Sequence, residues 1–268
     1  MSYAQINGIR IHYESYGQGD PILLINGLSA PAVNFLFQVR DLSPHYRVIT
    51  FDNRGVGETG VVDGALYPTA QMADDAAGLL DHLEIKRAHV LGTSMGGTIA
   101  QELALRHPKL VRSLVLACTW ARGDGRFLHT VRSWVALCRK LSVEERFREV
   151  LYPWIFTPAF LERPGPVEDA LKRALAYPYQ AAPEGIERQA GGVLAWNGTR
   201  VRDLKKIRVP TLVLVGREDI LTPPAFSREL ARLIPRAKLR IMAGAHGFFI
   251  EEAEAFNRAV LVFLRPVK

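Results

Sequence analysis

The sequence predicts an α/β protein with a mostly parallel central sheet flanked by helices, and three features support this fold class. Apolar runs of strand length alternate with segments of helical periodicity in both terminal parts of the chain. These runs are almost continuously apolar, which is typical of parallel strands that helices cover on both faces. The alternation stops over residues 120–209, where aromatic residues and a series of prolines favour a helical insertion.

The first two strands are predicted as a hairpin, because residues 5–15 alternate around Asn7-Gly8, a dipeptide that tolerates the positive φ angles of a type I′ turn. After the hairpin, segments with helical periodicity lie between the apolar runs of strand length. Further strands are expected at 21–26, 46–52, 88–94 and 112–119. Helices are expected around 33–42, 69–83 and 96–108.

Beyond the insertion, the alternation of strand and helix resumes. Strands are expected at 211–216 and 238–243, separated by a helix around 224–234. One last helix is predicted from an apolar stripe formed by Phe249, Ala253, Phe256, Val260 and Leu264. We therefore predict a core domain of residues 1–119 and 210–268, with a helical cap of residues 120–209 inserted after the sixth strand.

The bulk composition fits a globular protein, since 48% of the 268 residues are hydrophobic and 23% are charged. The N-terminal stretch lacks the basic-then-apolar pattern of a signal peptide, and no uncharged stretch approaches the roughly 20 residues that span a bilayer. We therefore expect a cytoplasmic protein that does not bind membranes. The formal net charge is +7, but the 34 Lys and Arg residues are interleaved with acids, which favours a solvated surface over nucleic-acid binding.

No cofactor or metal is expected from the motifs. Cys118 and Cys138 are the only cysteines and form no C-x-x-C pair, so we predict buried free thiols. Gly55-Val56-Gly57 falls short of a full phosphate-binding pattern.

Ser94 is the candidate nucleophile, at the centre of Gly92-Thr93-Ser94-Met95-Gly96. The five-residue pattern Gly-x-Ser-x-Gly occurs often by chance. Here it follows a predicted strand and precedes a predicted helix, which is the context that a strained nucleophile turn requires.

A serine hydroxyl needs a base, and the base needs an acid that fixes its tautomer. His246 is the candidate base, since it follows the last predicted strand in a loop of small residues. Asp219 follows the strand before it, so the order is Ser, Asp, His. Glu218 and Asp124 are rivals for the acid. The other histidines are expected to be structural or exposed: His12, His45, His82, His89, His107 and His129.

Acyl transfer also needs donors for the developing oxyanion. The backbone N–H of Met95 is one candidate by its position after the nucleophile. The loop after the strand at 21–26 offers the N–H of Leu28 as the second, with Gly27 and Asn26 supporting it.

With these motifs in this order, the chain resembles the α/β-hydrolase superfamily over essentially its whole length, and residues 120–209 match the family's cap. Residues 52–59, Asp-Asn-Arg-Gly-Val-Gly-Glu-Thr, resemble a family loop in which Asp52 and Arg54 are usually structural. Asn26 departs from the His that many relatives have before the oxyanion glycine. Because the hole uses main-chain groups, we expect this change to alter nearby hydrogen bonds and to keep the donors.

Asn26 also makes the chain similar to the 3-oxoadipate enol-lactonases. The stretches 95–97 and 207–216 are similar to that branch and to its esterase neighbours.

The leading hypothesis is a serine carboxylesterase for short or medium acyl or aryl esters, acting through an acyl-enzyme. Lactone hydrolysis of the enol-lactonase type is an alternative, as are cofactor-free perhydrolysis (haloperoxidase-like), cyanohydrin lysis by a hydroxynitrile lyase and C–C bond hydrolysis with the same triad. A non-catalytic ligand receptor is disfavoured because all three triad residues are present. Relatives that open epoxides or displace halide carry Asp in place of Ser94, which disfavours both reactions.

Substrate choice is expected to lie in the cap, around a small-molecule ester or lactone. Most cap aromatics are predicted to pack in its core and some to line an apolar pocket. They are Phe127, Trp134, Phe147, Tyr152, Trp154, Phe156, Phe160, Tyr177, Tyr179 and Trp196. An anionic lactone would need a cation, for which Arg122, Arg126 and Arg132 are available but not assigned. The sequence leaves open whether the protein is a monomer or a homodimer.

Overall fold

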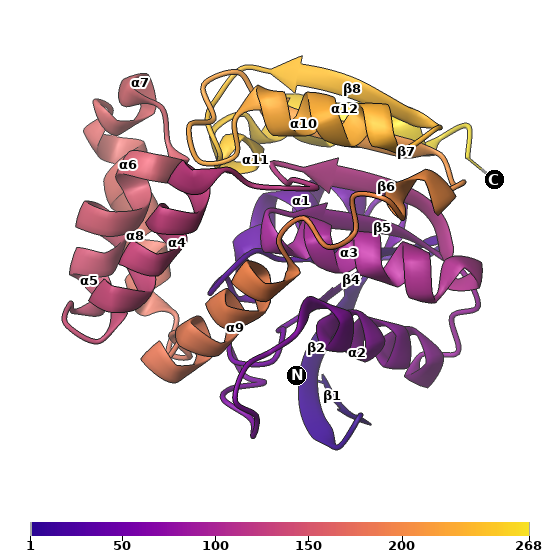
Figure 1. The fold of residues 1–268 in the computed structure, drawn as a ribbon, viewed down its shortest axis with the longest axis horizontal. Coiled ribbons are helices and arrows are strands. Elements are labelled where there is room, and N and C mark those ends of the chain that lie inside the picture. The colour runs from indigo at the N-terminus through magenta and orange to yellow at the C-terminus, as the bar shows by residue number, and fades with distance from the viewer. Residues whose placement is uncertain (1, 268) are drawn as a thin grey trace.

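A computed structural model describes residues 2–267 and contains an eight-stranded sheet with helices on both faces (Figure 1). The strand order is β1-β2-β4-β3-β5-β6-β7-β8. The pairs β1–β2 and β2–β4 are antiparallel, and all other neighbours are parallel. This confirms the predicted α/β class with a mostly parallel sheet. The strands are β1 (Ser2–Ile6), β2 (Ile9–Tyr16), β3 (Pro21–Ile25), β4 (Arg47–Phe51), β5 (Ala88–Thr93), β6 (Val111–Ala117), β7 (Thr211–Gly216) and β8 (Ala237–Met242).

Two hydrophobic clusters lie on opposite faces of the sheet. Neighbouring strand residues alternate between them, so that Leu23 packs in one cluster and Leu24 in the other. Helices α2, α3 and α10 contribute to the first cluster, and α1, α11 and α12 to the second. Both faces are therefore covered, which explains why the inner strands are apolar throughout. The core helices are α1 (Leu36–Leu42), α2 (Thr69–His82), α3 (Met95–Arg106), α10 (Pro224–Leu233), α11 (Phe248–Glu251) and α12 (Ala253–Leu264).

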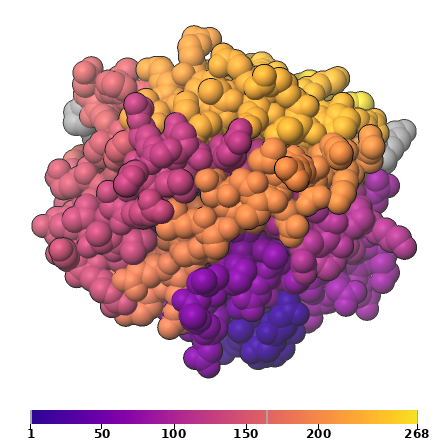
Figure 2. Space-filling model, viewed as in Figure 1, coloured from indigo at the N-terminus to yellow at the C-terminus, as the bar shows by residue number. Residues whose placement is uncertain are grey.

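The helical cap follows the sixth strand, β6, and lies at one end of the sheet (Figure 1). A small cluster of Tyr152, Phe156, Val167 and Leu171 forms its own core. Its last helix instead shares the main cluster of the sheet through residues such as Trp196. In Figure 2 this last helix lies in the orange segment, which packs between the rest of the cap and the N-terminal part of the chain. The cap elements are α4 (Gly125–Cys138), α5 (Val143–Glu145), the π-helical turn η3 (Arg146–Leu151), α6 (Tyr152–Ile155), α7 (Pro158–Leu161), α8 (Pro164–Ala176) and α9 (Pro183–Trp196).

The predicted hairpin turn and the buried thiols are confirmed, and the predicted last helix is not. Asn7 and Gly8 have φ angles of 49° and 80°, as a type I′ turn requires. Cys118 and Cys138 are buried free thiols. The prediction of a single last helix is wrong, because the helix breaks at Glu252, with φ −120° and ψ 40°, into α11 and α12.

Across the described residues, no helix has both the length and the apolar character needed to cross a membrane.

Candidate active site

Ser94 occupies a sharp turn between β5 and α3. Its φ of 52° and ψ of −121° are strained for a residue with a side chain. A Cβ on Gly92 would collide with the carbonyl oxygen of Gly96, and a Cβ on Gly96 would collide with that of Ile25. The glycines on both sides therefore let the turn pack closely. The Thr119 hydroxyl donates to the Ser94 carbonyl oxygen at 2.8 Å and helps to hold this conformation.

Asp219 and His246 come together at the carboxyl edge of the sheet. His246 Nδ1 lies 2.9 Å from Asp219 Oδ2, and the two residues are 6% and 2% exposed. The backbone N–H groups of Leu221 and Thr222 donate to Asp219 Oδ1 at 3.0 and 2.7 Å. With Nδ1 as the donor to the carboxylate, Nε2 of His246 is left as the basic nitrogen.

Thr222 is a residue that the sequence reasoning missed. Its hydroxyl donates to Asp219 Oδ2 at 2.8 Å and lies 3.0 Å from His246 Nδ1. A hydroxyl residue three positions after an Asp is a turn signal that could have indicated it. The carboxylate thus has three donors besides the imidazole, which fix its orientation toward His246.

The rival acids have other surroundings. Asp124 caps helix α4, where its carboxylate accepts the N–H of Phe127 at 2.9 Å. Glu218 is exposed to solvent. Neither carboxylate therefore has the contact with His246 that Asp219 makes.

The predicted oxyanion donors flank Ser94. Met95 is the first residue of α3, where an α-helix leaves its N–H groups without intrahelical partners. Gly27 lies against the nucleophile, since a Cβ built on it would be 3.1 Å from Ser94 Cβ. Leu28 follows Gly27 and lines the same cavity as Ser94. The two candidate N–H groups thus belong to segments that meet at the serine.

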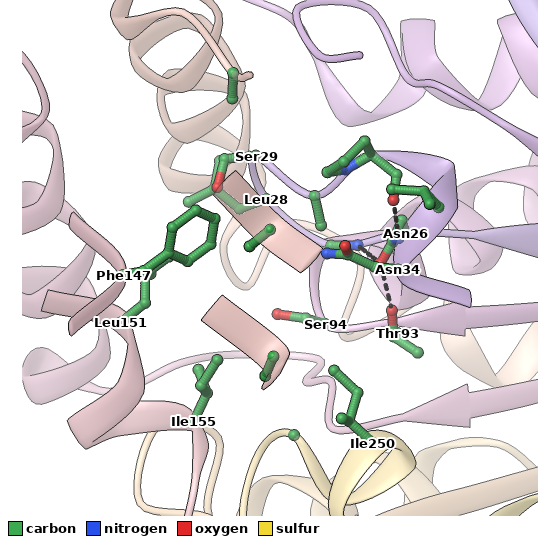
Figure 3. Close-up of a pocket in the computed structure, with 18 of the residues that line it drawn as sticks. Asn26, Leu28, Ser29, Asn34, Thr93, Ser94, Phe147, Leu151, Ile155 and Ile250 are labelled. Atoms are coloured by element: carbon green, nitrogen blue, oxygen red, sulfur yellow. Dashed lines mark hydrogen bonds between the residues drawn. The ribbon is translucent and has the colours of Figure 1, made fainter. Parts of the chain in front are cut away.

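Asn26 holds the loop that carries Gly27 and Leu28. Its Oδ1 accepts the Gly27 N–H at 3.0 Å and the Thr93 hydroxyl at 3.4 Å (Figure 3), and its Nδ2 donates to the Pro31 carbonyl oxygen at 2.7 Å. The side chain is thus committed to the loop and to β5.

Gln189 of α9 connects the cap to the same loop, and no motif in the sequence indicated this role. Its Oε1 accepts the Ser29 N–H at 2.8 Å, and its Nε2 donates to the Arg54 carbonyl oxygen at 2.8 Å. The amide is fully buried. A cap residue therefore helps to fix the backbone next to the candidate oxyanion donors.

Asp52 and Arg54 make structural contacts, as the resemblance implied. Asp52 accepts the Ala32 N–H at 2.7 Å and lies 3.0 Å from His12 Nδ1, and this hydrogen bond raises the pKa of His12. Arg54 Nε and Nη2 donate to Asp75 at 2.7 and 2.9 Å inside the protein. These contacts fix the loops beside the site.

A cavity of about 260 Å³ lies between core and cap, and both Ser94 and His246 line it. Figure 3 shows the Ser94 hydroxyl pointing into the cavity, toward the side on which Phe147 and Leu151 lie. Tyr177 also lines it, and burial raises the pKa of this phenol. The wall is mostly apolar: Leu28, Val33, Leu36, Phe37, Trp134, Val143, Phe147, Leu151, Ile155, Ile186, Leu221, Phe249 and Ile250.

The cations of this cavity differ from those considered from the sequence. Arg122, Arg126 and Arg132 are not among its lining residues, and Arg122 takes part in an exposed ion pair. Arg146 and Arg173 line it instead. These two residues were missed because proximity in sequence to the start of the cap does not indicate which cap helices face the core.

A serine on a strand-to-helix turn, a buried aspartate–histidine pair and a cavity between sheet and cap define an α/β hydrolase. A family model described as the alpha/beta hydrolase fold matches residues 20–253, and the chain belongs to this family.

Three proteins similar to this chain are named for different hydrolase activities. A putative carbamate hydrolase, RutD, of Azorhizobium caulinodans is 35% identical over 270 residues, which cover 98% of each chain. The enol-lactonase of Burkholderia xenovorans LB400 has a TM-score of 0.88 at 30% identity, covering 98% of this chain and 99% of its own. A thermophilic esterase of Thermogutta terrifontis has a TM-score of 0.88 at 28% identity, covering 100% and 99%.

Proposed function

We propose that this α/β hydrolase cleaves carboxylic esters through an acyl-enzyme, with Ser94 as nucleophile, His246 as base and Asp219 as the residue that orients His246. One observation carries the proposal: Ser94 and His246 line one cavity, and His246 Nδ1 is held by Asp219 at 2.9 Å. The esterase similar in fold and sequence supports the same substrate class.

The chemistry runs in two halves. His246 Nε2 takes the proton of the Ser94 hydroxyl while Oγ attacks the ester carbonyl carbon, and the carbonyl oxygen becomes an oxyanion. The N–H groups of Met95 and Leu28 stabilise this charge, each contributing about 3 kcal/mol. The tetrahedral intermediate then collapses, and the alcohol leaves with the proton from His246. Water, deprotonated by His246, attacks the acyl-enzyme in the same way and releases the acid and Ser94.

The cavity supports short or medium acyl esters or aryl esters, because its volume of about 260 Å³ and its apolar wall suit groups of that size. Lactones are a second candidate, favoured by the similarity in fold to an enol-lactonase and by cations in the cavity. A lactone carbonyl would meet the same nucleophile and donors.

The test is hydrolysis of 4-nitrophenyl esters from acetate to decanoate by the wild type, Ser94→Ala and Ser133→Ala. Ser133 is an exposed serine of the cap whose hydroxyl bonds within its own helix, so it serves as the matched control. We expect Ser94→Ala to lower kcat by roughly 10³-fold or more and Ser133→Ala to leave it unchanged. Unchanged hydrolysis by Ser94→Ala would refute the assignment.

Further measurements separate the alternatives. A phosphonate ester inhibitor is expected to add one phosphonyl group to the wild type, at Ser94, with loss of ester hydrolysis. Hydrolysis of simple lactones, followed by the acid that it releases, tests the second candidate. Peroxide-dependent bromination by an active esterase would add perhydrolysis, whereas cyanide release without ester turnover would replace the proposal with a lyase.

A further inference from the structure

The cap side of the cavity carries hydrogen-bond donors, and two of them, Nε of Arg146 and Nε1 of Trp134, are buried without an acceptor. Arg146, Arg173 and Trp134 all line it. Within the described part of the chain, no Asp or Glu is among the lining residues. Arg173 is exposed to solvent, whereas Arg146 is half-buried, so the charge of Arg146 has no acid to compensate it within the cavity.

Arg146 is the more enclosed of the two cations. It begins the π-helical turn η3, a geometry that is frequent at functional sites. Its Nη1 donates to the Ala181 carbonyl oxygen at 3.2 Å, and its Nε is buried without a partner. Over residues 2–267, no carboxylate lies within ion-pair distance of it. By contrast, Arg139 and Arg148 of the same cap each pair with two glutamates.

Arg173 and Trp134 extend this set of donors. Arg173 on α8 places its guanidinium carbon 5.9 Å from the ring centre of Phe37 on α1, so its side chain reaches from the cap to the core. Trp134 on α4 has its indole Nε1 buried without an acceptor. A buried donor that lacks an acceptor destabilises the protein, and an anion in the cavity would supply the missing acceptors after a small shift of these side chains.

We propose that Arg146, with Arg173 and Trp134, forms a carboxylate-binding subsite, so that the preferred substrate carries an acid group remote from the carbonyl that Ser94 attacks. This proposal rests on the proposed ester or lactone hydrolysis. A planar guanidinium matches a carboxylate, and the charge-assisted bonds are strong in an apolar cavity. The substrate class is therefore the half-esters of dicarboxylic acids.

The test uses two substrates that differ in charge and by one methyl group: the mono-4-nitrophenyl ester of adipic acid and its methyl 4-nitrophenyl diester. The wild type is expected to have the higher kcat/KM for the anionic half-ester. We expect Arg146→Met to lower kcat/KM for the half-ester roughly 10- to 150-fold and to leave the diester within about threefold. Arg146→Lys should retain part of the preference. Arg148→Met, on the same turn, should leave the ratio unchanged.

Equal kcat/KM of the wild type for both substrates, or an equal loss on both in Arg146→Met, would overturn the subsite. Hydrolysis of the diester that depends on Ser94 would still support the proposed function in that case. Isothermal titration calorimetry with monomethyl adipate measures binding at the subsite without turnover. It compares Ser94→Ala with the double variant Ser94→Ala/Arg146→Met. Loss of binding with Arg146→Met supports the subsite even if neither ester is hydrolysed, and equal binding overturns it.

Discussion

Replacing Asp75 by Asn tests the buried ion pair that anchors the loop beside the site. The side chains of Arg54 and Asp75 are only 2% and 3% exposed and form two hydrogen bonds. Asparagine would leave the guanidinium buried without a counter-charge, and breaking such a pair costs about 3–5 kcal/mol. At roughly 2–4 °C per kcal/mol, the melting temperature should fall by about 6–20 °C.

The neighbouring residue provides the control. Asp74 pairs with Arg106 at 2.7 Å, but these side chains are 34% and 39% exposed, so Asp74→Asn should cost about 0–1 kcal/mol. Urea unfolding followed by circular dichroism measures both variants against the wild type. If Asp75→Asn unfolds within 1 kcal/mol of Asp74→Asn, burial does not set the strength of the Arg54 pair, and the reasoning fails.

Two further predictions concern Thr222 and His89. Thr222→Val removes a hydrogen-bond donor to Asp219 that the other partners of the carboxylate only partly replace. We therefore expect kcat/KM on a 4-nitrophenyl ester to fall about tenfold. Thr222→Ser keeps the hydroxyl and should stay near the wild type. Equal rates for these two variants would contradict this role of the hydroxyl. Burial lowers the pKa of His89 from 6.5 to about 4, so its neutral ring contributes stability above pH 6.5 that is lost as pH falls toward 4. His89 should thus make the free energy of unfolding roughly 2 kcal/mol lower at pH 5 than at pH 7. Urea unfolding of His89→Asn should show a smaller difference between these two pH values. An unchanged difference would mean that another group is responsible.

Hydrophobic patterning predicted most of the fold because period-2 and period-3.6 patterns depend only on which faces are buried. The predicted strand at 88–94 matches β5 (Ala88–Thr93), and the Asn7-Gly8 turn is where the hairpin reverses. The last helix shows the limit of this reasoning. Its apolar stripe continues through the break at Glu252, because α11 and α12 pack on the same cluster.

Tertiary contacts that no local pattern contains lie beside the break. Glu251 accepts the Ala245 N–H at 3.0 Å and the Thr157 N–H at 2.6 Å, which joins α11 to the loop before His246 and to the cap. Burial raises the pKa of this carboxyl. The cap and the loop of His246 are therefore held together by a residue that the sequence presented only as one more helical acid.

The sequence by itself determined the fold class, the cap after the sixth strand and the candidates Ser94, Asp219 and His246, because turn chemistry and the carboxyl ends of parallel strands are local properties. Only the tertiary structure decided which side chains from distant segments meet them. Thr222, Gln189 and the cavity-facing Arg146 depend on how helices of the cap and loops of the core pack, and packing is fixed by shape rather than by spacing along the chain.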